Sequence, residues 1–175
     1  TTKIIAHRGF MEKGVENTLS SLIASAEAGA DMVEIDIQQT KDGKFIVFHD
    51  ASLTRLAGKK ESVYQMTQAE LMEVTVHSGQ LSDTIPSLEQ MLEKSRELNI
   101  QLLIEIKTHG YETDDMLQRL IALLDKYRVL DVHYIQSLEM DIATQIKEME
   151  PRLKVGVVYA FNLGALPKTD LDFIA

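Results

Sequence analysis

Three carboxylates stand in two apolar runs of the sequence. Glu34 and Asp36 alternate with apolar residues in 32–37, and Glu105 lies near the end of 102–107. The alternation places Glu34 and Asp36 on one face of a strand. Taken singly, each could be an exposed surface acid. In a parallel sheet, however, both faces are covered, so an inward carboxylate must be paired or must coordinate a cation. Three oxygen ligands favour Mg²⁺ or Ca²⁺ over zinc.

Two histidines stand where predicted strands end. His7 follows the first apolar run, and His49 ends the return strand of a predicted hairpin. A single histidine in such a place is more often structural than catalytic. Two histidines at one metal site could cleave a phosphodiester, because one removes a proton from the nucleophile and the other protonates the leaving oxygen. The other histidines, His77, His109 and His133, have no such context.

Two cations and one further acid complete the set of candidates. Arg8 could hold a phosphate with two parallel hydrogen bonds, and Lys107 could supply a point charge on the same face as Glu105. Each could equally be a surface cation or a structural partner of a nearby carboxylate. Glu16 precedes a predicted helix, where it could stabilise the helix dipole or orient His7 or Arg8.

Short apolar runs alternate with helical patterns, which predicts βαβ units and a parallel sheet. The carboxylates and Lys107 fall in the C-terminal halves of their predicted strands, and in barrels and open α/β sheets sites are built at this end. The main predicted strands cover residues 4–6, 32–37, 102–107, 132–136 and 154–159. A capping box at Ser87–Gln90 predicts the start of one helix, and others are predicted at 116–127 and 142–149.

One stretch breaks this alternation, because the segment between Asp36 and His49 is too short for a crossover helix. Asp42-Gly43 predicts a two-residue hairpin turn, and that register sets Asp36 opposite His49. Residues 51–85 then form a predicted insertion, in which Thr67–Glu70 is a second capping box.

The composition excludes some classes of function and of metal site. The chain has 175 residues, 45% of them hydrophobic, and a formal net charge of −9. The acidic balance argues against a general nucleic-acid binder, which needs a basic face. It does not exclude an anionic substrate, because a metal or a few local cations can reverse the field inside one cleft. Since the chain has no cysteine, it has no disulfide and no thiolate zinc site.

Five short motifs occur in order along the chain: His7-Arg8-Gly9, Glu16-Asn17-Thr18, Val33-Glu34-Ile35-Asp36 with Thr40-Lys41-Asp42-Gly43, His49-Asp50 and Glu105-Ile106-Lys107. Together they closely resemble the signature of the glycerophosphodiester phosphodiesterase family. Each motif alone is weakly specific, but the five in this order, over most of the chain, are very specific.

This resemblance implies a (β/α)8 TIM barrel with an insertion after the second strand. It implies hydrolysis of glycerophosphodiesters to glycerol 3-phosphate and an alcohol, with one divalent cation, Mg²⁺ or Ca²⁺. In the family mechanism the glycerol 2-hydroxyl attacks phosphorus, and water then opens a cyclic phosphate. The resemblance implies three metal ligands, Glu34, Asp36 and Glu105, and an acid–base pair, His7 and His49. It also implies two phosphate-binding cations, Arg8 and Lys107, and one supporting acid, Glu16.

The chain departs from the family pattern in two places. Val15 stands where the family usually has proline, which concerns the stiffness of the loop rather than the chemistry. The last two strands of the family barrel, one with a tryptophan-threonine-valine-asparagine motif, are absent, in agreement with the lack of tryptophan. We therefore expect residues 1–175 to be a C-terminally truncated catalytic domain with about six of the eight strands, and the native polypeptide to continue or something else to close the gap.

Two alternatives stay open. A phospholipase D-like or phosphoinositide-cleaving enzyme of the same superfamily would need apolar loops, whereas the insertion is polar. A non-catalytic binding module of a larger membrane protein would be marked by the loss of a histidine or a metal carboxylate, and none is lost. The abrupt start at Thr1 is compatible with a cytoplasmic domain and with one tethered by a membrane segment outside this chain.

Overall fold

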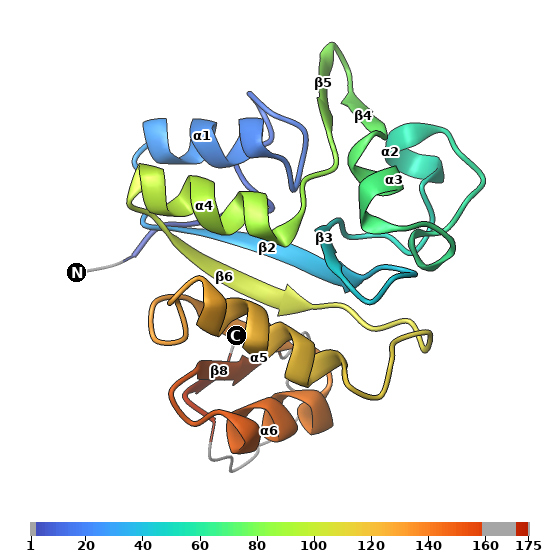
Figure 1. Cartoon of the computed structure of the whole chain (residues 1–175). Helices are drawn as coiled ribbons and strands as arrows, with labels where there is room; N and C mark the ends of the chain where they lie inside the picture. Colours follow the sequence, from blue (N-terminus) through green and yellow to red (C-terminus); the bar gives the residue numbers. More distant parts are fainter. Residues whose placement is uncertain (1–2, 159–170, 175) are drawn as a thin grey trace, which may run out of the picture.

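A sheet of parallel strands forms the centre of the computed structural model, which describes residues 3–158 and 171–174 (Figure 1). The parallel strands follow the order β1-β2-β6-β7-β8-β9, so within the described residues β1 and β9 are the two edges and the sheet stays open. The bounds are Ile5–His7 for β1, Met32–Gln39 for β2, Gln101–Ile106 for β6, Tyr134–Ser137 for β7, Lys154–Val157 for β8 and Phe173–Ile174 for β9. The predicted strand 154–159 is observed up to Val157, and Tyr159 lies outside the described residues.

Four long helices pack on this sheet (Figure 1): α1 (Leu19–Glu27), α4 (Leu88–Leu98), α5 (Met116–Lys126) and α6 (Met140–Met149). Val33 and Ile35 of β2 and Ile104 of β6 are fully buried in the core shared with these helices. Since successive strand residues point to opposite faces, Glu34 and Asp36 point away from this core. No helix in the described part of the chain is long and apolar enough to span a membrane.

Both predicted capping boxes are confirmed. Ser87 accepts a hydrogen bond from the Gln90 N–H and begins α4, and the Gln90 side chain accepts one from the Ser87 N–H. Thr67 and Glu70 form the same reciprocal pair at the start of α3 (Gln68–Met72). These side chains satisfy N–H groups that would otherwise lack partners in the first helical turn.

The hairpin after β2 is present, but its predicted register is wrong by one residue. β3 (Phe45–Val47) runs antiparallel to β2. The Phe48 N–H donates to the Asp36 carbonyl oxygen at 2.9 Å, so Phe48 rather than His49 lies opposite Asp36. His49 therefore reaches the site from the segment that follows β3.

The shift arises because the turn contains three residues instead of two. The Gly43 N–H donates to the Thr40 carbonyl oxygen at 2.9 Å, and the Thr40 N–H donates to the Lys44 carbonyl oxygen at 2.8 Å. Gly43 has a φ of 75°, in the left-handed region. A tight turn followed by a left-handed glycine is the three-residue hairpin loop with a bulge. Because this loop is one residue longer than the predicted one, each residue of β2 faces the residue before its predicted partner in β3.

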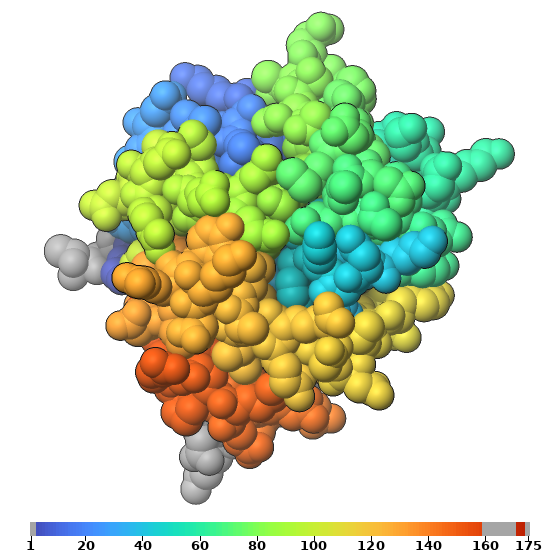
Figure 2. Space-filling model, viewed as in Figure 1, coloured from blue at the N-terminus to red at the C-terminus, as the bar shows by residue number. Residues whose placement is uncertain are grey.

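The segment 51–85, expected to be an insertion, packs around a second, smaller core. It consists of α2 (Thr54–Ala57), the 3₁₀ helix η1 (Val63–Gln65), α3 and the hairpin of β4 (Thr75–Ser78) and β5 (Leu81–Thr84). Val15 from the β1–α1 loop and Phe48 after β3 are buried in the same core. Figure 2 shows the hairpin of β2 and β3, in cyan, between the green insertion and the orange α5. The insertion thus packs on the segments that precede Glu16 and His49.

Candidate active site

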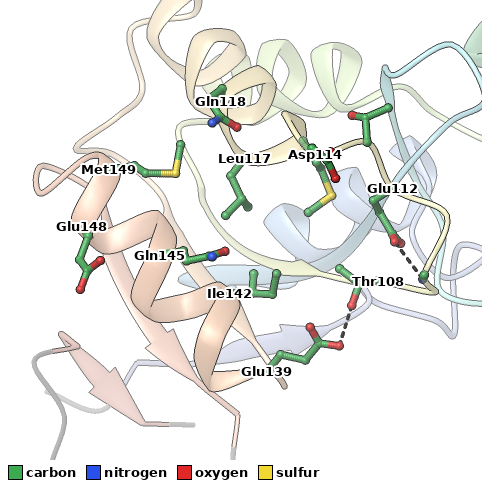
Figure 3. Close-up of a pocket in the computed structure, with 13 residues that line it drawn as sticks. Thr108, Glu112, Asp114, Leu117, Gln118, Glu139, Ile142, Gln145, Glu148 and Met149 are labelled. Atoms are coloured by element: carbon green, nitrogen blue, oxygen red, sulfur yellow. Dashed lines mark hydrogen bonds between the residues drawn. The ribbon is translucent and has the colours of Figure 1, made fainter.

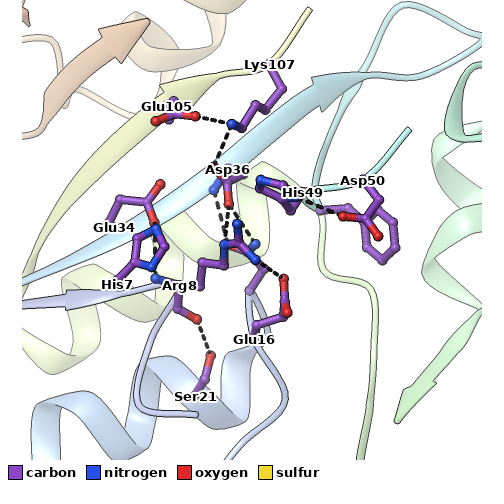
Figure 4. Close-up of polar contacts among 12 residues, drawn as sticks. His7, Arg8, Glu16, Ser21, Glu34, Asp36, His49, Asp50, Glu105 and Lys107 are labelled. Carbon is purple, nitrogen blue, oxygen red and sulfur yellow. Dashed lines mark hydrogen bonds and ion pairs between the residues drawn. The ribbon is translucent and has the colours of Figure 1, made fainter. Parts of the chain in front are cut away.

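The three predicted metal-binding carboxylates converge beside the C-terminal ends of β1 and β6, Glu34 and Asp36 from within the longer β2 and Glu105 from β6 (Figure 4). Asp36 and Glu105 are direct partners across these parallel strands, and Glu34 lies on the same face of β2. Each residue is at most 7% exposed, and one carboxylate oxygen from each lies within 4.8 Å of the other two. This oxygen-rich set suits a hard divalent cation such as Mg²⁺ or Ca²⁺.

With all three carboxylates ionised, the cluster would carry one more negative charge than its two neighbouring cations, Arg8 and Lys107, compensate. Burial, and then the charge of Asp36, raise the pKa of Glu34 to about 8. Among the described residues, Glu34 Oε1 has no hydrogen-bond partner. Lys107 forms ion pairs with Glu105 and, at 3.9 Å, with Asp36, so two carboxylates share one ammonium. A buried oxygen without a partner in such a cluster fits a bound divalent cation.

Two amide side chains fix the orientation of these carboxylates, and sequence reasoning did not single them out. Asn17 donates to Asp36 Oδ2 at 3.0 Å and accepts from the Asp36 N–H at 3.1 Å. Gln136 of β7 donates to Glu105 Oε1 at 3.2 Å. Asn17 stands next to Glu16 in a recognised motif, whereas nothing near Gln136 in the sequence points to the site. Hydrogen bonds of this kind orient the ligands of a metal.

The two predicted acid–base histidines approach the cluster from different segments. His7 ends β1 directly beside Glu34 in register, and its Nε2 lies 3.5 Å from Glu34 Oε2, with 68% of its side chain exposed. His49 Nδ1 lies 2.8 Å from Asp50 Oδ1. Since an ionised carboxylate only accepts, Nδ1 carries the hydrogen, which in the neutral imidazole leaves the lone pair on Nε2. Figure 4 shows the two histidines on either side of Asp36.

Gln38 fixes the backbone that carries His49. Its Nε2 donates to the carbonyl oxygens of Phe48 and Asp50, at 2.7 Å each. The side chain is buried on the same face of β2 as Asp36. Gln38 therefore determines the position of His49. The predicted hairpin register had placed His49 by pairing of the two strands instead.

Arg8 lies at the centre of the polar contacts in Figure 4. Its backbone N–H donates to Glu34 at 3.1 Å, its Nη1 donates to Glu16 at 3.1 Å, and its Nε lies 3.5 Å from Asp36. It adopts a φ of 54°, which is rare for a residue with a side chain. Such strain costs about 1–3 kcal/mol and persists where the surrounding contacts hold it, often at functional sites.

Arg55 of the insertion is a further residue that sequence reasoning missed. It forms ion pairs with Glu16 and Asp50. Glu16 is 39 positions away from it along the chain, so no local spacing connects the two. The contact depends on the packing of residues 51–85 against the β1–α1 loop.

A cavity of about 510 Å³ lies between α5 and α6 (Figure 3). Its lining begins at Thr108 and continues over Leu117, Ile142 and Met149. None of the eight predicted site residues lines it. The candidate chemistry therefore lies at the strand ends and not in this cavity.

Residues 7–172 match the glycerophosphoryl diester phosphodiesterase family. The chain belongs to that family. It is 30% identical over 166 residues to a glycerophosphodiester phosphodiesterase of Caldanaerobacter subterraneus, covering 93% of this chain and 68% of the relative. It is 38% identical over 110 residues to a glycerophosphodiester phosphodiesterase of Bacillus altitudinis, covering 58% of this chain and 45% of the relative.

Solved structures of the glycerophosphoryl diester phosphodiesterase family have the same fold. A phosphodiesterase of Oleispira antarctica, in complex with the product sn-glycerol-3-phosphate, matches with a TM-score of 0.81 and 26% identity. The match covers 90% of this chain and 66% of that one. The predicted fold class, an α/β barrel, is thereby confirmed, and the described residues form six of its parallel strands. The chain spans between 45% and 68% of the length of these three proteins.

Proposed function

We propose that this chain carries the active site of a metal-dependent phosphodiesterase that hydrolyses glycerophosphodiesters to glycerol 3-phosphate and an alcohol. One observation carries this proposal: three buried carboxylates converge at the strand ends, with a histidine on either side. Family membership and the product bound by the Oleispira antarctica relative support the substrate class. Residues 1–175 would contribute the catalytic domain, with 51–85 as an insertion within it.

We assign the cation to Glu34, Asp36 and Glu105, because their oxygen atoms form one cluster and Glu34 Oε1 has no hydrogen-bond partner among the described residues. A bound Mg²⁺ or Ca²⁺ would act as Lewis acid and template for the phosphate. Arg8 and Lys107 stand beside these carboxylates, where their charges can face the other phosphate oxygens.

The two histidines carry the proton transfers of this proposal. One removes the proton from the glycerol 2-hydroxyl, whose oxygen then attacks phosphorus, and the other protonates the departing alcohol oxygen. Water opens the resulting cyclic phosphate, with the two histidines exchanging roles. His49 is prepared to accept a proton at Nε2, because Asp50 fixes the hydrogen on Nδ1. Glu16 supports Arg8 through its hydrogen bond.

Release of alcohol from a panel of glycerophosphodiesters, with and without a chelator, tests the proposal. His7→Ala and His49→Ala are expected to lower kcat by about 10²–10⁴-fold, the usual contribution of a general acid or base. His77→Ala is the matched control, because His77 is exposed on β4 of the insertion. Full activity of either site variant, or of the chelated protein, would contradict the assigned roles.

A lipid substrate is a second candidate, favoured by exposed apolar side chains on the loops that follow three strands. Met11 after β1, Tyr111 after β6 and Leu138 after β7 are 49%, 61% and 53% exposed. These loops leave the strand ends where the carboxylates lie. The same assay separates the two candidates, because an enzyme for lipids would cleave lysophosphatidylcholine faster than glycerophosphocholine.

A further inference from the structure

Arg55 binds two carboxylates from two other segments of the chain. Its Nη1 and Nη2 donate to the two oxygens of Glu16 at 2.7 and 3.0 Å. Its Nε and Nη2 donate to the two oxygens of Asp50 at 2.8 and 3.1 Å. A planar guanidinium that meets both carboxylates with two bonds each fixes their orientation as well as their separation.

Each of these carboxylates contacts a residue with a proposed role in the reaction. Asp50 lies 2.8 Å from His49 Nδ1, and Glu16 accepts from Arg8 Nη1 at 3.1 Å (Figure 4). The contacts thus continue from Arg55 in two directions, to the acid–base histidine and to the phosphate-binding arginine.

The charges in this arrangement are matched. Burial would raise the pKa of Glu16, but Arg55 and Arg8 together lower it below its usual value. The hydrogen bonds of Arg55 lower the pKa of Asp50 to about 2. Both carboxylates are therefore ionised, so each can only accept hydrogen bonds from its two neighbours.

We propose that Arg55 is a positioning residue that connects the insertion to the active site. It holds Asp50 against His49 and Glu16 against Arg8. Arg55 itself contacts neither histidine nor the carboxylate cluster through any observed bond among the described residues. This inference rests on the proposed function for the roles of His49 and Arg8, and its structural part can be tested without substrate.

Three variants of the chain test the inference: Arg55→Gln, Arg55→Lys and Arg119→Gln. Arg119 is the matched control, because its side chain is 48% exposed, like that of Arg55, and pairs at 2.9 Å with Asp115 one turn earlier. Arg55→Lys keeps the charge but cannot make two pairs of parallel bonds. Far-UV circular dichroism and thermal melting establish that each variant folds, and Arg55→Lys carries the test if Arg55→Gln does not.

The first measurement is the tautomer of His49, read from the ¹⁵N shifts of its ring and assigned by His49→Gln. The wild-type chain and Arg119→Gln are expected to hold the hydrogen on Nδ1. Arg55→Gln is expected to shift a large fraction of the ring to the Nε2–H tautomer, and Arg55→Lys a smaller one. An unchanged Nδ1–H population in the folded Arg55 variants would overturn the inference.

The second measurement is turnover of a glycerophosphodiester. Arg55→Gln is expected to lower kcat by about 10²-fold, the loss that a displacement of about 1 Å can cause, whereas Arg119→Gln leaves it within twofold of the wild type, about the spread of a surface substitution. An unchanged kcat in Arg55→Gln would overturn the inference. A wild-type chain without turnover would overturn the proposed function instead, and the tautomer measurement would still decide the role of Arg55.

Discussion

His49 owes its place in the site to side-chain contacts rather than to strand pairing. The predicted register set it opposite Asp36, but the bulged turn moves Phe48 to that position. Gln38 holds the backbone on both sides of His49, and Asp50 holds its ring. The residue types of the site were therefore predictable from short motifs, whereas the atoms that position His49 were not.

His133, which lies outside the candidate site, makes stability depend on pH. It is 4% exposed, and its Nδ1 accepts a hydrogen bond from the Leu102 N–H at 3.0 Å. Burial lowers the pKa of His133 to about 4. The unfolded chain, with a histidine pKa of about 6.5, then binds a proton that the folded state refuses. The contribution of neutral, buried His133 to stability is complete above the histidine pKa of the unfolded chain, and it is lost as the pH falls towards 4.

We expect the free energy of unfolding to fall by about 2 kcal/mol between about pH 7 and about pH 5 through His133 alone. Urea denaturation at the two pH values measures this difference. In His133→Asn, which can still accept a hydrogen bond but does not titrate, this part of the loss is expected to disappear. The exposed His77→Asn should retain it, and an equal loss in wild type and His133→Asn would refute the explanation.

The loop between β1 and α1 depends on a close approach of its backbone to the helix. Gly9 has a φ of 87°, and a Cβ at this position would lie 2.4 Å from Ser21 Oγ and 3.1 Å from the Ser21 backbone carbon. Gly29 after α1 has a similar φ of 82°, but a Cβ there would meet nothing within 4 Å. Substitution of Gly29 therefore tests backbone strain alone, whereas substitution of Gly9 tests strain and close packing together.

Gly29→Ala is expected to cost about 1 kcal/mol of stability, the strain of a left-handed alanine. Gly9→Ala is expected to cost about 2–4 kcal/mol, because overpacking against Ser21 adds to the same strain. It should also reduce turnover, since Arg8 immediately precedes Gly9. Denaturant unfolding of both variants, with a kcat measurement, checks this prediction; equal losses of stability would show that the close approach is unimportant.

The helices were predictable from the sequence, because their hydrophobic periodicity and their capping residues lie within or next to the helix itself. The helix at 116–127 and both capping boxes are found within one residue of the prediction. The hairpin register was not predictable, since it depends on one additional turn residue. Arg55 was not predictable either, because its partner Glu16 lies in a different loop.

At the scale of the whole molecule, a net charge of −9 and a buried carboxylate cluster both oppose folding in the absence of a cation. A divalent cation that binds only the folded chain should stabilise it by about 2.7 kcal/mol at a concentration 100-fold above its Kd. Thermal melting with Mg²⁺ and with Ca²⁺, against a chelator, measures this effect and identifies the preferred ion.

Glu34→Gln is the variant that connects this effect to the cluster. We expect it to melt at a higher temperature than the wild type in chelator at neutral pH, because Glu34, with its pKa raised to about 8, must take up a proton on folding and glutamine need not. We also expect it to lose most of the stabilisation by the cation. Glu27→Gln, on the exposed side of α1, should behave like the wild type. A full cation response in Glu34→Gln would place the binding site elsewhere.

Val15 orders the β1–α1 loop through packing in the folded chain. A proline at this place would restrict the loop in the unfolded chain as well, and so reduce the entropy lost on folding. Val15 is instead 1% exposed in the core of the insertion, which constrains the loop only in the native state. The loop that carries Arg8 and Glu16 and the insertion should therefore open together as one cooperative unit, with similar hydrogen-exchange protection of their amides.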